Sequence, residues 1–221
     1  MNIKSYTGKA YFVAITVSKL LILMAHLRTF SKAIQPSDAW RLKFLAHDIV
    51  PDIWPRVPIH PLKVNFSTAS VDFGNILRPE QTRSEPNYID TSTGFGHHFL
   101  IMTDLDYPST STNKSERYEY LHWMVCNIVN VDLTNGHTLA AYVPPEKSGH
   151  EGGEHRYMIT YFLQHEGPLL DFLDFAIPEE DTKNRHRRTF CTRTFTENNL
   201  FGPPIAANFF RIKWEWEDDD P

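Results

Sequence analysis

The sequence predicts an all-β domain in which two sheets pack as a sandwich, with a few short helices at the periphery. Its 221 residues are 41% hydrophobic, which is enough to bury one full-sized core. Fifteen prolines and only short apolar runs argue against a helical bundle. Apolar and polar residues alternate regularly in several segments, which is typical of strands, so a β-sandwich is the expected class.

One short helix is predicted ahead of the strands. Ser37 can cap a helix that ends near Ala46, with Trp40 and Phe44 on its apolar face. The proline-rich stretch 51–61 cannot form a ladder within a central strand, because proline lacks the N–H donor. It is therefore expected at an edge or on the surface.

Strands are expected over the ranges 62–66, 70–73, 87–90, 98–104, 121–130, 138–143, 155–164 and 208–216. In the range 155–164, His155, Tyr157 and Ile159 share one face and the intervening residues share the other. Both faces are largely apolar, as in a central strand covered on both sides. Residues 168–204 show no regular pattern and should mix loops with short helices.

Residues 1–37 differ from the rest in composition. They carry five basic residues and no acid, and they are largely apolar between Ala10 and Met24. This composition is typical of a mitochondrial import segment, and a secretory signal is the alternative. A membrane-spanning helix is less favoured, because the apolar run is shorter than the ~20 residues that a bilayer requires. We therefore expect a targeting or partner-binding extension over 1–37 and a β-domain over 38–221, without stable membrane insertion.

Two short segments about thirty residues apart carry the candidate binding chemistry. The first contains Asp104, Asp106 and Pro108 and continues to Tyr120 and His122, and the second contains His155 at the start of a strand. If the runs are strands, these side chains meet at one mouth. Such a mouth would suit a small phosphorylated anion, with two imidazoles to meet its charge and carboxylates to hold the imidazoles.

A basic cluster follows in the irregular region. The net charge of −5 and the pI near 6.1 are unfavourable for binding RNA phosphates, so we expect limited contact with RNA. The cluster is either a solvated loop face or a contact for RNA or an acidic partner. The residues proposed for that contact are Lys183, Arg185, Arg187 and Arg188.

Cysteine, metal and hydrolase chemistry are all disfavoured by the residue pattern. Cys126 and Cys191 are too few for a disulfide framework and are expected to be free, buried thiols. Several histidines lie near the two acids, but helical metal-ligand spacing is missing, so no metal or cofactor is expected. The sequence lacks a Gly-x-Ser-x-Gly nucleophile motif, and we expect a protein that is not an enzyme.

The motifs together resemble the phosphatidylethanolamine-binding protein family. The resemblance rests on Asp-x-Asp-x-Pro at 104–108, on His122-Trp123 opening a strand that contains Asn127, and on Gly-x-His-Arg-Tyr at 153–157 in a strand that ends at Gln164. It implies a Greek-key β-sandwich and binding rather than turnover. The anion-pocket residues it implies are Asp104, Asp106, Pro108, Tyr120, His122, Pro145 and His155.

Five further segments are most similar to the mitochondrial ribosomal branch of that family. They are 55–60, 119–123, 142–145, 188–190 and 208–210. This resemblance implies a structural protein of the central protuberance of the mitochondrial large ribosomal subunit, located in the matrix. The fold would then act as a docking block for other mitochondrial ribosomal proteins. The alternative is a soluble phospholipid- or phosphate-binding regulator of kinase or protease partners, and a metal-assisted hydrolase is a distant third.

Overall fold

The computed structural model describes residues 38–92, 95–108, 117–147, 153–168, 177–178 and 185–215. Contacts divide the chain after Ala39, and the fold below is that of the second part, which begins at Trp40. The predicted extension 1–37, including the cap residue Ser37, lies outside the described residues.

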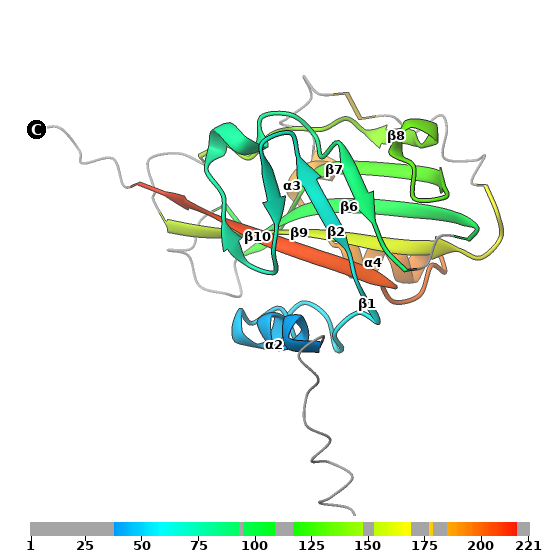
Figure 1. Cartoon of the computed structure of the whole chain (residues 1–221), viewed down its shortest axis with the longest axis horizontal. Helices are drawn as coiled ribbons and strands as arrows, with labels where there is room; N and C mark the ends of the chain where they lie inside the picture. Colours follow the sequence, from blue (N-terminus) through cyan, green and yellow to red (C-terminus); the bar gives the residue numbers. More distant parts are fainter. Residues whose placement is uncertain are drawn as a thin grey trace, which may run out of the picture. The chain divides into compact units, whose positions relative to one another are not determined.

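A large, mostly antiparallel sheet forms the centre of the described domain (Figure 1). Its strands follow the order β1-β10-β9-β6-β7-β8, and β4 also pairs with β10. They are β1 (His60–Pro61), β4 (Asn75–Ile76), β6 (His97–Tyr107), β7 (Tyr118–Val129), β8 (His137–Ala140), β9 (Gly153–Gln164) and β10 (Ala206–Trp214). The proline-rich stretch ends in β1, at the edge of this sheet, where a proline without an N–H donor is tolerated.

A smaller sheet covers one face of the large one. It has the order β3-β2-β5, with β2 at Lys63–Phe66, β3 at Ala69–Val71 and β5 at Tyr88–Asp90. Val64 and Ile89 of this sheet share a buried core with Tyr157 and Ile159 of β9. The domain is therefore mostly β, with two packed sheets and few short helices, while the Greek-key connection stays a prediction.

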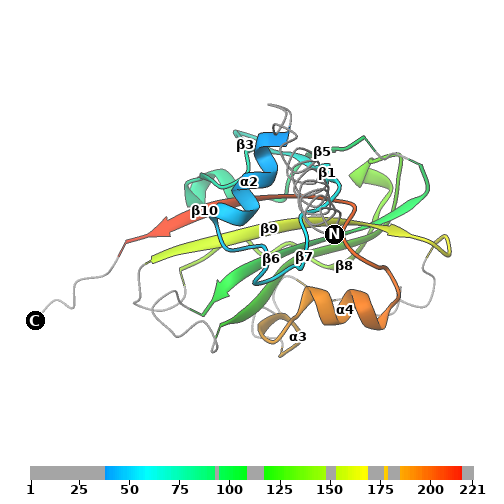
Figure 2. The ribbon, with the colours of Figure 1, turned by 90° about the horizontal axis from the view of Figure 1, so that it is seen from below.

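Helices also pack on the large sheet, and Figure 2 shows α3 and α4 on the side opposite to β3 and β5. They are α2 (Ala39–Ala46), α3 (Arg185–Arg188) and α4 (Thr192–Asn198). Phe44 of α2 packs on Phe209 of β10 with ring centroids 5.1 Å apart, and Phe195 of α4 packs on Phe99 of β6 at 5.7 Å. Two 3₁₀ turns, η2 (Pro79–Thr82) and η4 (Leu133–Asn135), complete the described elements.

One buried asparagine joins the two sheets. The Asn208 side chain on β10 is 1% exposed and donates to the carbonyls of Leu62 and Val71 at 2.7 and 3.1 Å. Its Oδ1 accepts from the Phe73 backbone N–H at 2.9 Å. A buried amide stabilises a fold only when its partners are in place, so Asn208 fixes where the small sheet meets β10.

Two family-motif residues, Asn127 and Gln164, form a structural pair rather than a site. Asn127 has a left-handed backbone (φ 58°) beside a register shift between β6 and β7. The Gln164 Nε2 donates to Asn127 Oδ1 at 2.9 Å, and its Oε1 accepts from the Asn127 N–H at 2.7 Å. This reciprocal pairing satisfies polar groups that the irregular ladder leaves unpaired.

The structure corrects the expectation for one cysteine. Cys126 is fully buried in β7, as predicted, but Cys191 is exposed at the residue before α4. Both thiols are free. No helix in the described part of the chain is long and apolar enough to cross a bilayer.

Candidate functional site

The sheet register brings the predicted site residues together around Asp104. Asp104 on β6 lies opposite Tyr157 on β9 and opposite Tyr120 on β7. His155 and His122 are each two residues from those tyrosines, so they project from the same face of the sheet. Both imidazoles contact the Tyr157 ring, with centroids 6.4 and 5.4 Å from it.

Asp104 and His155 form a buried ion pair. The His155 Nδ1 lies 2.7 Å from Asp104 Oδ2, and each residue is only 3% exposed. Burial alone lowers the His155 pKa, but the hydrogen bond to Asp104 and the charge of Asp104 outweigh burial and raise it. Since Nδ1 faces Asp104, the Nε2–H of the imidazolium is the donor that a bound anion would meet.

His122 has the opposite character. Its Nδ1 lies 2.7 Å from the Val143 carbonyl, which can only accept, so Nδ1 carries the proton. Burial lowers the pKa of His122 to about 4, and its imidazole is neutral at pH 7. Its Nε2 is then an acceptor. The expectation that two imidazoles meet the charge of an anion is therefore wrong for His122. Of the two imidazoles, His155 is the one that can supply positive charge when it is protonated.

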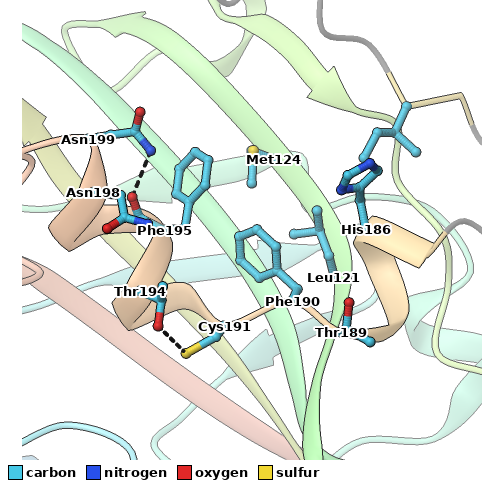
Figure 3. Close-up of a pocket in the computed structure, with 11 residues that line it drawn as sticks. Leu121, Met124, His186, Thr189, Phe190, Cys191, Thr194, Phe195, Asn198 and Asn199 are labelled. Carbon is cyan, nitrogen blue, oxygen red and sulfur yellow. Dashed lines mark hydrogen bonds between the residues drawn. The ribbon is translucent and has the colours of Figure 1, made fainter.

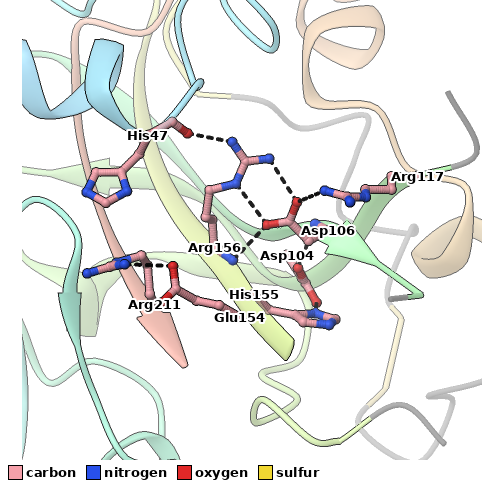
Figure 4. A network of polar contacts seen from close by, with 8 residues as sticks. All are labelled: His47, Asp104, Asp106, Arg117, Glu154, His155, Arg156 and Arg211. Carbon is pink, nitrogen blue, oxygen red and sulfur yellow. Dashed lines mark hydrogen bonds and ion pairs between the residues drawn. The ribbon is translucent and has the colours of Figure 1, made fainter. Parts of the chain in front are cut away.

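Asp106 binds arginine side chains rather than an imidazole (Figure 4). The expectation that the carboxylates hold the imidazoles is therefore wrong for Asp106. Its Oδ2 accepts from the Arg156 backbone N–H and Nε at 3.0 and 2.8 Å. Its Oδ1 accepts from Arg156 Nη2 at 2.8 Å and from Arg117 Nη1 at 3.1 Å. Burial acts to raise the pKa of Asp106, but the hydrogen bonds and positive charge of Arg156 outweigh burial, and the net result is a lowered pKa. Asp106 is therefore a carboxylate whose two oxygens already accept hydrogen bonds. It supports the site through its backbone N–H, which donates to Asp104 Oδ1 at 2.8 Å.

The remaining predicted pocket residues lie around this core. Tyr120 is 7% exposed, and its ring centroid lies 4.9 Å from that of His122 and 5.0 Å from that of Tyr107. Pro108 is half-buried directly after Tyr107, and Pro145 is buried two residues beyond the carbonyl that anchors His122. The structure thus groups aromatic and imidazole rings beside a single buried ion pair.

Among the four predicted contact residues for RNA or an acidic partner, Arg187 is misassigned. It is 0% exposed, and its guanidinium donates to five backbone carbonyls, those of Leu121, His122, Ala141, Ile177 and Pro178. A buried guanidinium in this setting ties β7 to the segments beside it and cannot meet a partner. Arg188 is exposed and remains a candidate. Lys183 and the Arg185 side chain lie outside the described residues.

Sequence reasoning gave no role to Arg156 or to Val143. Arg156 follows His155 directly, so the alternation along a strand turns its side chain away from that of His155. The irregularity of β6 between Asp104 and Tyr107 lets Asp106 meet it. The alternation was present in the sequence, whereas the carbonyl of Val143 carries no side-chain signature. Within the ranges described above, no three His, Cys, Asp or Glu side chains are placed to hold a metal ion.

Comparison with known proteins shows a matching family and a shared fold. A family model described as phosphatidylethanolamine-binding protein matches residues 80–210, more than half of the chain. A 26 kDa secreted antigen of Toxocara canis is 30% identical over 172 residues, which are 76% of this chain and 62% of the antigen. The chain therefore spans less than two thirds of that relative.

Two solved structures share the fold. The carboxypeptidase Y inhibitor, solved in complex with its cognate proteinase, superposes with a TM-score of 0.63 at 23% identity, covering 83% of this chain and 99% of the inhibitor. A phosphatidylethanolamine-binding protein from Plasmodium falciparum gives a TM-score of 0.58 at 22% identity, covering 77% and 95%. At this identity the likeness establishes the fold alone.

Proposed function

The chain belongs to the phosphatidylethanolamine-binding protein family, and on that premise we propose that it is a binding protein for a small anionic head group rather than an enzyme. The observation that carries the proposal is the buried Asp104–His155 pair. It holds one imidazolium ready to donate to a phosphate or carboxylate oxygen, and a charge-assisted bond of this kind is stronger than a neutral one.

The neighbouring neutral imidazole supports a particular kind of head group. His122 offers an acceptor at Nε2, whereas His155 offers a charged donor. A ligand that carries both an anionic oxygen and a hydrogen-bond donor satisfies both rings, and phosphoethanolamine is such a ligand. Since His155 is the one charged donor among the described residues of this site, we expect a dissociation constant near the millimolar range, about −4 kcal/mol.

Titration of the protein with phosphoethanolamine, followed by the imidazole nitrogen resonances, tests this proposal. We expect His155 Nε2 to shift at millimolar ligand and His155→Gln to abolish saturation, while His122→Asn weakens binding only partly. Because the His155 pKa is raised, binding should be full below the ordinary histidine range and lost as pH rises through the folded pKa. An unchanged His155 resonance at 20 mM ligand would refute the proposal.

A regulatory role toward a partner protein is the second part of the proposal. The carboxypeptidase Y inhibitor shares this fold and was solved bound to its proteinase, so the fold can present a surface to another protein. For this chain we propose a soluble regulator whose partner, a kinase or a protease, responds to the head group. Partner binding should therefore change on adding phosphoethanolamine, and a partner that binds His155→Gln and wild type equally would contradict the link.

The mitochondrial ribosomal role stays a separate proposal supported by the composition of residues 1–37. Five basic residues and no acid favour import into the matrix, where the β-domain would dock on other ribosomal proteins. Cosedimentation of the tagged full chain with the mitochondrial large subunit, compared with a chain lacking 1–37, tests it. If the tagged full chain stays at the top of the gradient, the ribosomal role is excluded. The head-group proposal does not depend on this result.

A further inference from the structure

Two adjacent cavities lie beside α4, and neither is lined by Asp104 or His155. The first has a volume of about 270 Å³ and lies between α4, α3 and β7. The second has a volume of about 440 Å³ and lies where β6, β7 and β9 end beside α4. Phe190 and Cys191 line both cavities, so the two adjoin at this short segment.

The first cavity is predominantly apolar. Leu121 and Met124 of β7 line it from the sheet, and the rings of Phe190 and Phe195 line it from the helical side (Figure 3). Leu121 and Met124 are 1% and 2% exposed, so this wall belongs to the rigid core. A preformed apolar cavity of this kind suits a hydrocarbon chain, because burying each CH₂ group is favourable by about 0.8 kcal/mol.

The second cavity is lined by three guanidinium groups, those of Arg117, Arg156 and Arg193. Arg156 uses Nε and Nη2 on Asp106 and Nη1 on the His47 carbonyl, and Arg193 uses Nε on Glu197. A guanidinium has five N–H donors, so Arg156 and Arg193 both keep donors for a ligand. The carboxylates that pair with them, Asp106 and Glu197, do not line the cavity.

Two acids, Glu119 and Asp52, lie in the same lining. Glu119 is 8% exposed and accepts from the backbone N–H and hydroxyl of Thr192, and burial raises its pKa. Its carboxylate therefore already accepts hydrogen bonds within the protein. Asp52, the other acid, is exposed to solvent. Each of the three guanidinium groups already has a carboxylate partner, so the lining offers an anion N–H donors rather than net positive charge. A carboxylate matches the fork geometry of those donors.

We propose that the two cavities form one site for a single-chain anionic amphiphile, such as a medium-chain fatty acid. The hydrocarbon chain occupies the cavity between Met124 and Phe195, and the carboxylate lies beside Arg193 and Arg156, with Phe190 and Cys191 under the junction. Asp104, His122 and His155 line neither cavity, so this site is distinct from the proposed head-group site.

Cys191 is a reporter built into this site. It is exposed and lines both cavities, whereas Cys126, the other cysteine, is fully buried, so a thiol reagent reports on Cys191. The experiment measures the rate at which N-ethylmaleimide alkylates the native full chain, with dodecanoate kept below its micelle concentration. At ten times its dissociation constant, dodecanoate should slow alkylation about tenfold, because about a tenth of the sites remain free.

Two further ligands and three variants define the outcome. Acetate lacks the chain and dodecanol lacks the charge, so neither should protect Cys191 at the same concentration. Arg193→Glu should weaken dodecanoate about fivefold, the upper range for one exposed ion pair. Asn198→Trp, at an exposed position on the rim of the first cavity, should block the chain. Arg78→Glu, an exposed charge reversal elsewhere, is the matched control and should change nothing.

The proposal is overturned if dodecanoate leaves the alkylation rate unchanged, since occupancy must cover Cys191. Equal protection by dodecanol in wild type and Arg193→Glu would also overturn it, because the site would then take any apolar molecule. Protection that survives Asn198→Trp would place the ligand elsewhere. Phosphoethanolamine should not protect Cys191, which keeps this result separate from the head-group proposal.

Discussion

Protonation of His122 should be a main route by which acid destabilises the fold. The ring is 5% exposed, donates through Nδ1 to the Val143 carbonyl, and has a pKa of about 4 against an ordinary value of 6.5. Because the folded pKa lies below the unfolded one, the unfolded chain binds the proton first as pH falls. The stabilisation is therefore complete above pH 6.5 and is lost progressively between pH 6.5 and 4.

The magnitude follows from the width of that window. One pKa unit corresponds to about 1.4 kcal/mol, so the free energy of unfolding should fall by about 2 kcal/mol between pH 6.5 and 5, and by about 3 kcal/mol at pH 4. His155 contributes with the opposite sign, because its pKa is raised. Its stabilisation is present below pH 6.5 and is lost as pH rises through the folded pKa, so the two histidines can be separated by the direction of their effects.

Urea unfolding at pH 5 and pH 7 measures the effect, with His122→Asn as the comparison. Asparagine can still donate an N–H to the Val143 carbonyl but does not titrate. We expect wild type to lose about 2 kcal/mol more than the variant on acidification. Groups common to both proteins, such as the buried His98, cancel in this difference. Equal pH dependence of the two proteins would show that His122 is not the titrating group.

Two further predictions concern buried charges. Asp106→Asn should lower the free energy of unfolding by about 3–5 kcal/mol, because it leaves Arg156 without its counter-charge, and urea unfolding measures this. A loss below 1 kcal/mol would contradict the assigned role. Arg187→Met should lower the free energy of unfolding by about 2–4 kcal/mol, because several buried carbonyls lose their donor. The exposed neighbour variant Arg188→Met should stay within about 0.5 kcal/mol, and equal melting temperatures for the two would refute the distinction.

The strands and the grouping of the site were predictable, because both depend on local periodicity. Alternation in 155–164 assigned Tyr157 and Ile159 to one core and Met158 and Phe162 to the other, as the structure has them. The same rule placed His155 on one face of its strand. Boundaries were less predictable, since β6 and β7 run beyond the apolar residues that identified them and β8 ends earlier, at Ala140.

The protonation states and the roles of the charged side chains were not predictable in the same way. His122 and His155 look alike in the sequence, and they differ because one meets a carbonyl from a distant segment and the other a carboxylate. Arg187 and Arg188 are likewise identical neighbours, but only one has five carbonyls around it. Such partners come from tertiary contacts that no short pattern encodes.

The position of β10 has a consequence for synthesis of the chain. This strand, near the end of the sequence, pairs with β9 and also with the short β1 and β4, and its Asn208 bonds to Leu62, 146 residues earlier. During synthesis on the ribosome the large sheet therefore cannot be completed until residue 214 has left the exit tunnel. Until then one side of β9 stays unpaired. Such late closure makes folding slow and exposes a β-edge to other chains, so a nascent or C-terminally truncated chain should depend on chaperones far more than the finished protein does.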